Sequence, residues 1–299
     1  MRKKILHASI LLTLLFISCG SDDPIAPEAP NIVDDPSSSL ALVAVVENAN
    51  IVSGTGLEVA FFLKRKEACE ILASIFQVDP SMLENKTLAQ IVNEYGEPWM
   101  LREISKVATG HYKKIILLSD SAATSKTFLQ TLRNLSQEGL TIDVIYDLHS
   151  NGSDVVFYDG RYPITDITSP IANEHLRMRS LYQTCCYGQM MIDDWERVNV
   201  RCVNGAVASN SIVLFSPIAF LKNWIAGQSY KASVQNAFQQ EIDTIMTYNT
   251  IIPEIGMLMT GTYLTDSKQE VGGIKPDMLW RELPFRKNSM RLYAGPLLR

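Results

Sequence analysis

The chain has 299 residues, of which 46% are hydrophobic, so it can bury a substantial core. Its formal net charge is −5, and it becomes about −8 if residues 1–18, which hold three basic residues, are removed. A chain this acidic lacks the basic surface of a nucleic-acid binder, so nucleic acids are not expected as partners.

The N-terminus has the features of a secretory signal. A basic start, MRKK, precedes an apolar run that is too short to span a bilayer and ends in LLFISCGSDD. LLFISC resembles the lipobox of bacterial lipoproteins, with Phe16 where that pattern prefers Leu, and it implies acylation of Cys19. The acidic residues that follow resemble the surface-export signal of Bacteroidota lipoproteins, which implies the outer face of the outer membrane. The alternative is an ordinary secreted protein in which Cys19 is incidental.

Composition divides the chain into four parts. Residues 1–18 are expected to be a signal peptide that is removed. Residues 19–40 are expected to be an acylated cysteine and a flexible linker, because they are rich in Pro, Asp and Ser. Residues 41–245 have ordinary globular composition and are expected to form one α/β domain, on which a C-terminal extension, residues 246–299, packs.

Hydrophobic periodicity predicts strands and helices that alternate along the domain. The expected strands are 41–47, 113–119, 141–150, 180–186 and 200–209, with a hairpin at 154–165 that turns at Asp159 and Gly160. The expected helices are 56–77, 86–96, 98–108, 123–139, 169–178, 188–199 and a pair within 216–243 broken near Gly227. From residue 244 onward the periodicity is weak and predicts loops and short elements. This order predicts a three-layer α/β/α sandwich with a mostly parallel sheet.

Two of the expected strands end in reactive residues. His149 ends one strand, and Ser150 and Gly152 follow it; Cys185 and Cys186 end a later strand. In an open α/β sheet, ligands and catalytic groups gather beyond the carboxyl ends of the strands. If the two strands are neighbours, they lie about 5 Å apart, and an imidazole can then exchange a proton with a thiol.

At these residues the sequence resembles the caspase-like superfamily of cysteine peptidases, which includes caspases, metacaspases, legumains, clostripain-like and gingipain-like enzymes. Members place a His at the end of one strand and a Cys at the end of the next, followed by Gly. The stretch from Thr184 to Gly188 fits that spacing with Cys185 as the nucleophile, and the tighter caspase form would make it Cys186. Cys185 is favoured, because Gln183 does not stand at its place in the caspase pattern if Cys186 is the nucleophile.

The resemblance implies a cysteine endopeptidase that acts on peptide or protein substrates without a cofactor or metal. His149 would be the acid/base, and the backbone N–H groups of Ser150 and Cys185 would form the oxyanion hole. One departure is Ser150, since members of the superfamily usually have Gly directly after the catalytic His. The alternatives are a catalytically inactive, lipid-anchored binding module and a thiol hydrolase, such as an amidase, that does not cleave peptides. A strained vicinal disulfide between Cys185 and Cys186 is a further alternative.

Overall fold

The helices and strands follow the order expected from the sequence through most of the chain. The computed structural model describes residues 39–47, 66–207, 210, 214–251 and 269–272. The strands are β1 (Leu40–Glu47), β2 (Lys114–Ser119), β3 (Thr141–Ser150), β4 (Asp154–Phe157), β5 (Gly160–Pro163), β6 (Met178–Gln183), β7 (Cys202–Ala206) and β8 (Gln269–Gly272). The helices are α2 (Lys66–Phe76), α3 (Leu88–Ile91), α4 (Glu97–Ala108), α5 (Ser125–Gln137), α6 (Ile164–Thr168), α7 (Ile192–Arg197), α8 (Ser216–Ile225) and α9 (Tyr230–Ile251).

The sheet is mixed but mostly parallel. Within the described residues it has eight strands, in the order β2-β1-β3-β6-β7-β8, with β4 attached to β3 and β5 to β4. Neighbouring strands from β2 to β7 are parallel, whereas β8 pairs antiparallel with β7. The α/β class and the mostly parallel sheet expected from the sequence are therefore confirmed. β1, the first strand of the chain, lies between β2 and β3.

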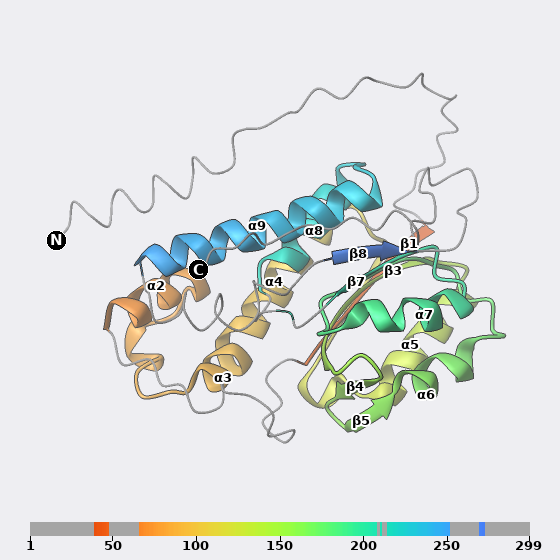
Figure 1. Cartoon of the computed structure of the whole chain (residues 1–299), viewed down its shortest axis with the longest axis horizontal. Helices are drawn as coiled ribbons and strands as arrows, with labels where there is room; N and C mark the ends of the chain where they lie inside the picture. The colour runs from red at the N-terminus through yellow and green to blue at the C-terminus, as the bar shows by residue number, and fades with distance from the viewer. Residues whose placement is uncertain (1–38, 48–65, 208–209, 211–213, 252–268, 273–299) are drawn as a thin grey trace. The chain divides into compact units, whose positions relative to one another are not determined.

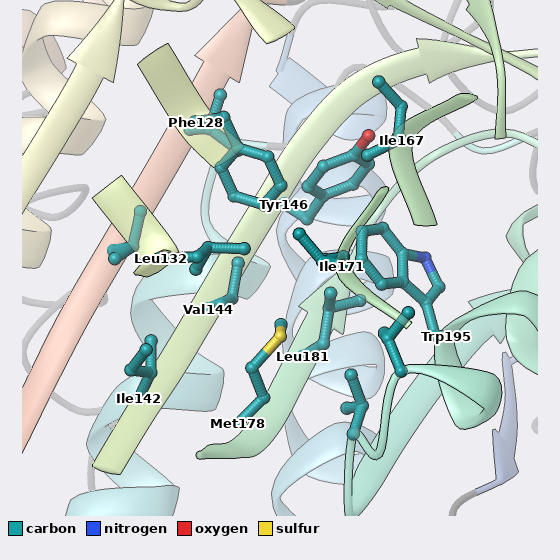
Figure 2. Close-up of a cluster of buried hydrophobic side chains, with 14 of the residues drawn as sticks. Phe128, Leu132, Ile142, Val144, Tyr146, Ile167, Ile171, Met178, Leu181 and Trp195 are labelled. Atoms are coloured by element: carbon teal, nitrogen blue, oxygen red, sulfur yellow. The ribbon is translucent and has the colours of Figure 1, made fainter. Parts of the chain in front are cut away.

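Helices pack on both faces of the sheet. Side chains along β1 and β3 point alternately to the two faces, and those on each face belong to a separate buried cluster. On one face, alternate residues of β3, among them Val144 and Tyr146, pack with Phe128 of α5, Ile167 of α6 and Trp195 of α7 (Figure 2). On the other face, alternate residues of β1 and Ile145 of β3 pack with α4 and α8 (Figure 1). Each fully buried Leu, Ile, Val or Phe contributes about 1.5–3 kcal/mol to this packing.

Helix α5 shows how local sequence and packing agree. Its N-cap is Thr124, whose Oγ1 accepts a hydrogen bond from the backbone N–H of Thr127 at 3.0 Å. Phe128, Leu132 and Leu135 follow at spacings of four and three, so they form one buried stripe against the sheet.

The carboxylate of Asp143 is buried on the second face of the sheet, where side chains from several surrounding elements bind it. Arg179 of β6 binds both of its oxygens, and Tyr112 Oη and Trp224 Nε1 donate hydrogen bonds at 2.8 and 3.0 Å. Ser180 Oγ donates another at 2.7 Å. The Arg179 guanidinium also lies 4.9 Å from the centroid of the Trp224 ring, so the charges in this network are paired and enclosed.

The structure corrects two predictions. Residues 169–178 do not form a helix, because α6 precedes them and ends in a short 3-10 turn at Ser169–Ile171. α9 continues to Ile251, into residues for which loops and short elements were expected, whereas β8 is one such short element in the C-terminal extension. The signal peptide, Cys19 and the linker up to residue 38 lie outside the described residues, as do 252–268, 273–299 and the first part of the expected helix 56–77.

Candidate active site

His149 and Ser150 are the last two residues of β3. The strand is buried from Ile142 to Leu148, and His149 and Ser150 at its carboxyl end are partly exposed. Both residues also pair with β4, in which Val156 is opposite His149. The candidate base is therefore held on regular backbone at the carboxyl edge of the sheet.

The cysteine pair lies just beyond the end of the neighbouring strand. β6 runs parallel to β3 with Tyr146 opposite Gln183, which is its last residue. The ladder continues by one further bond, from the Thr184 N–H to the Tyr146 carbonyl at 3.1 Å. Continuing this register puts Cys185 level with Leu148, on strands that lie about 5 Å apart, and Cys186 lies in the turn that follows.

Cys185 and His149 lie on opposite faces of the sheet. Cys185 belongs to the buried cluster that contains Tyr146 and Leu148. His149, one residue further along β3, is on the other face, together with Asp147. Asp147 there accepts a hydrogen bond from the Thr184 hydroxyl. Cys185 therefore packs into the core on the face of the sheet opposite to the imidazole.

The environments of the two thiols differ accordingly. Cys185 is 1% exposed and its Sγ lies 3.9 Å from the Tyr146 carbonyl oxygen. Burial raises the pKa of the Cys185 thiol well above its usual range, and the nearby Asp147 carboxylate raises it further. Cys186 is partly exposed, and its Sγ accepts a hydrogen bond from the Asn210 N–H at 3.3 Å. None of the four cysteines in the described residues forms a disulfide, so the vicinal disulfide is absent.

Buried polar groups fix the backbone around the cysteines. Asn204 of β7 bonds both backbone groups of Gln183, accepting from its N–H at 3.0 Å and donating to its carbonyl at 2.9 Å. The Tyr230 hydroxyl lies 2.9 Å from Asn204 Oδ1. The Gln183 side chain donates to the Gly188 carbonyl at 2.9 Å, which closes the loop that carries Cys186. The sequence analysis did not single out Asn204 or Tyr230, since their partners are far from them along the chain.

The loops after His149 and after Cys186 contact each other. Gly152 has a φ of +93°, and a Cβ there would lie 2.6 Å from Met190 Sδ and 3.0 Å from Tyr187 Cβ. Ser150, which replaces the glycine usual in the superfamily, accepts a hydrogen bond on Oγ from the Gly152 N–H at 2.8 Å. Its hydroxyl also lies 3.7 Å from Met191 Sδ, so the side chain of Ser150 is turned into the loop contact.

Two buried carboxyl groups lie near the same edge of the sheet. Glu241 of α9 accepts hydrogen bonds from the backbone N–H groups of Phe215 and Ser216 at 3.2 and 2.6 Å, at the start of α8. Burial raises its pKa to about 7. Glu47, at the end of β1, also has a pKa raised to about 7 by burial and by the charge of Asp120. Both carboxyl groups therefore titrate near neutral pH.

The remaining cysteines and histidines of the described residues have simpler environments. Cys69 and Cys202 are buried, and His111 and His175 are exposed. In the described part of the chain, no group of three or more His, Cys, Asp or Glu side chains is arranged to hold a metal ion.

No known protein family matches the sequence, and no curated protein is significantly similar to it. None of the helices in the described ranges combines the length and the hydrophobicity that a transmembrane helix requires. The site is therefore interpreted from its own geometry.

Proposed function

We propose that the protein is a cysteine endopeptidase with a caspase-like fold, in which Cys186 is the nucleophile and His149 the acid/base. One observation carries the proposal. Of two neighbouring parallel strands, β3 has His149 next to its last residue, and β6 ends three residues before the partly exposed thiol of Cys186, while the adjacent thiol of Cys185 is buried. The sequence favoured Cys185 and left Cys186 open; the burial of the two side chains supports Cys186.

The proposed reaction needs only groups that the chain supplies and water. The Cys186 sulfur attacks the peptide carbonyl carbon while its proton passes to His149. The tetrahedral intermediate collapses, and the departing amine takes the proton from His149. Water then hydrolyses the thioester, which releases the carboxylic acid and restores the thiol. Backbone N–H groups at Ser150 and at the cysteine pair are the candidates for the oxyanion hole.

The arrangement of elements supports the caspase-like assignment. Helices pack on both faces of a mostly parallel sheet, as a three-layer α/β/α sandwich requires, and the His and Cys ends belong to adjacent strands. The superfamily's usual Gly is replaced by Ser150, which favours the second candidate function, an inactive surface protein that keeps the fold and binds a partner.

Covalent labelling separates these functions and the two cysteines. A biotinylated peptidyl acyloxymethyl ketone should label the wild-type chain and the Cys185→Ala variant, but not Cys186→Ala. Cys185→Ala should also lose about 1–2 kcal/mol of stability, because its sulfur is fully buried, whereas Cys186→Ala should unfold almost like the wild type. His149→Ala should abolish peptide turnover and retain slow alkylation of the thiol.

Three results would contradict the proposal. Loss of labelling in Cys185→Ala alone would transfer the role to Cys185. No labelling of the wild type, or equal labelling of the wild type and both cysteine variants, would favour the inactive binding protein. Labelling of Cys186 without turnover of any peptide in a library would instead favour a thiol hydrolase of another kind.

We also propose that the protein is a lipoprotein anchored through Cys19 to the outer face of the outer membrane. The support is the lipobox-like LLFISC and the acidic residues after it. Protease added to intact cells should degrade the protein, and Cys19→Ala should yield a soluble or unprocessed form. Full protection from protease in intact cells would exclude surface exposure.

A further inference from the structure

The segment between β7 and α8 contacts the Cys186 sulfur. Asn210, in this segment, is 7% exposed. Its backbone N–H donates to Cys186 Sγ at 3.3 Å, and its carbonyl oxygen lies 3.8 Å from the same sulfur. The N–H and the carbonyl of Asn210 belong to two consecutive peptide groups, and of the two the N–H is the closer to the sulfur.

The side chain of Asn210 fixes this contact. Its Nδ2 donates a hydrogen bond of 2.8 Å to the carbonyl of Thr184, two residues before Cys186. The Thr184 hydroxyl is in turn bonded to Asp147 of β3, and its N–H to the Tyr146 carbonyl. The Asn210 amide therefore ties its own backbone to the rigid end of β6.

We propose that Asn210 is a positioning residue that holds its own main-chain N–H against the Cys186 sulfur and thereby favours the thiolate. The inference rests on the proposed assignment of Cys186 as the reactive thiol. A hydrogen bond to a charged acceptor is stronger than one to a neutral acceptor, so the N–H stabilises the thiolate more than the thiol. The carbonyl oxygen of Asn210 disfavours the thiolate, but it lies farther from the sulfur than the N–H does. The N–H therefore has the larger effect.

Two other titratable groups lie at this end of the sheet. Asp147, which accepts a hydrogen bond from the Thr184 hydroxyl, would oppose ionisation of a thiol near it, and a protonated His149 would favour it. Neither residue is changed when Asn210 is replaced. A shift in the pKa of Cys186 in such a variant therefore reports the loss of the N–H contact.

The test is the pH dependence of iodoacetamide alkylation of Cys186 in the full chain, followed by mass mapping of the modified peptide. Asn210→Ala should raise the apparent pKa of Cys186 by about one unit, so alkylation slows about tenfold at pH values below the pKa. Asn210→Leu has nearly the same size, removes the side-chain donor and adds no charge, so it should shift the pKa about as far. Asn236→Ala removes an exposed amide bonded to Gln228 and serves as the matched control.

The outcomes distinguish this inference from the proposed function. Unchanged alkylation profiles in the two Asn210 variants, with a reactive Cys186 in the wild type, would overturn the role of Asn210 alone. A wild-type Cys186 that alkylates no faster than a free cysteine would overturn the proposed function. If Asn210→Ala does not fold, as judged by circular dichroism, Asn210→Leu carries the test.

Discussion

Gly205 is the position where one added methyl group should damage the fold most. It lies in β7, and a Cβ there would be 2.2 Å from both the backbone N of Gln189 and the backbone C of Gly188. Backbone cannot rotate away as a flexible side chain can, so the loop after the cysteines must move by about 1 Å to restore ordinary contacts. We expect Gly205→Ala to lower the free energy of unfolding by about 3 kcal/mol, at the upper end of the usual range for overpacking.

Urea denaturation of Gly205→Ala and of a matched control measures this loss. Gly227→Ala is the control, because a Cβ at Gly227 meets nothing within 4 Å and costs only the strain of a φ of +82°, about 1–2 kcal/mol. Displacement of the loop should also weaken the bond from Gln183 to the Gly188 carbonyl and reduce labelling of Cys186. A smaller loss in Gly205→Ala than in Gly227→Ala would refute the reasoning.

Two further predictions concern buried charges. Glu47 has a native pKa of about 7, above its ordinary 4.5, so the native state binds this proton more tightly than the unfolded state and stability falls as pH rises from about 4.5 through 7. In urea unfolding, the wild type should therefore lose stability between pH 5 and pH 8, and Glu47→Gln should lose roughly 1–3 kcal/mol less over the same interval. An equal loss in the two proteins would contradict the raised pKa of Glu47. Asp143→Ala leaves the Arg179 guanidinium buried without its carboxylate and should cost about 3–5 kcal/mol in the same assay, whereas a loss below about 1 kcal/mol would show that water replaces the carboxylate.

Local sequence patterns predicted the elements whose signals are local. β3 was predicted with its bounds, because an apolar run ends in polar residues at both ends. The β4–β5 hairpin followed from Asp159 and Gly160 at its turn. The end of α9 was missed because residues 244–250 are rich in Thr and Asn, which are weak helix formers, and their helical state depends on context that propensity omits.

Part of the candidate site could also be predicted, because that part has a local sequence signal. Position at a strand end singled out His149 and the cysteine pair. The sequence could not distinguish the environments of Cys185 and Cys186, because these depend on the register between β3 and β6 and on a contact from Asn210, 24 residues later in the chain. Neither the register nor that contact has a local sequence signature.

The direction of β1 determines at which edge of the sheet the preceding part of the chain joins the fold. The chain enters β1 at Leu40, at the amino edge of the parallel strands, whereas His149 and Cys186 lie at the carboxyl edge. If Cys19 is lipidated as proposed, the membrane attachment joins the described fold at the amino edge of the sheet, so the strand ends at His149 and before Cys186 are not the point of attachment.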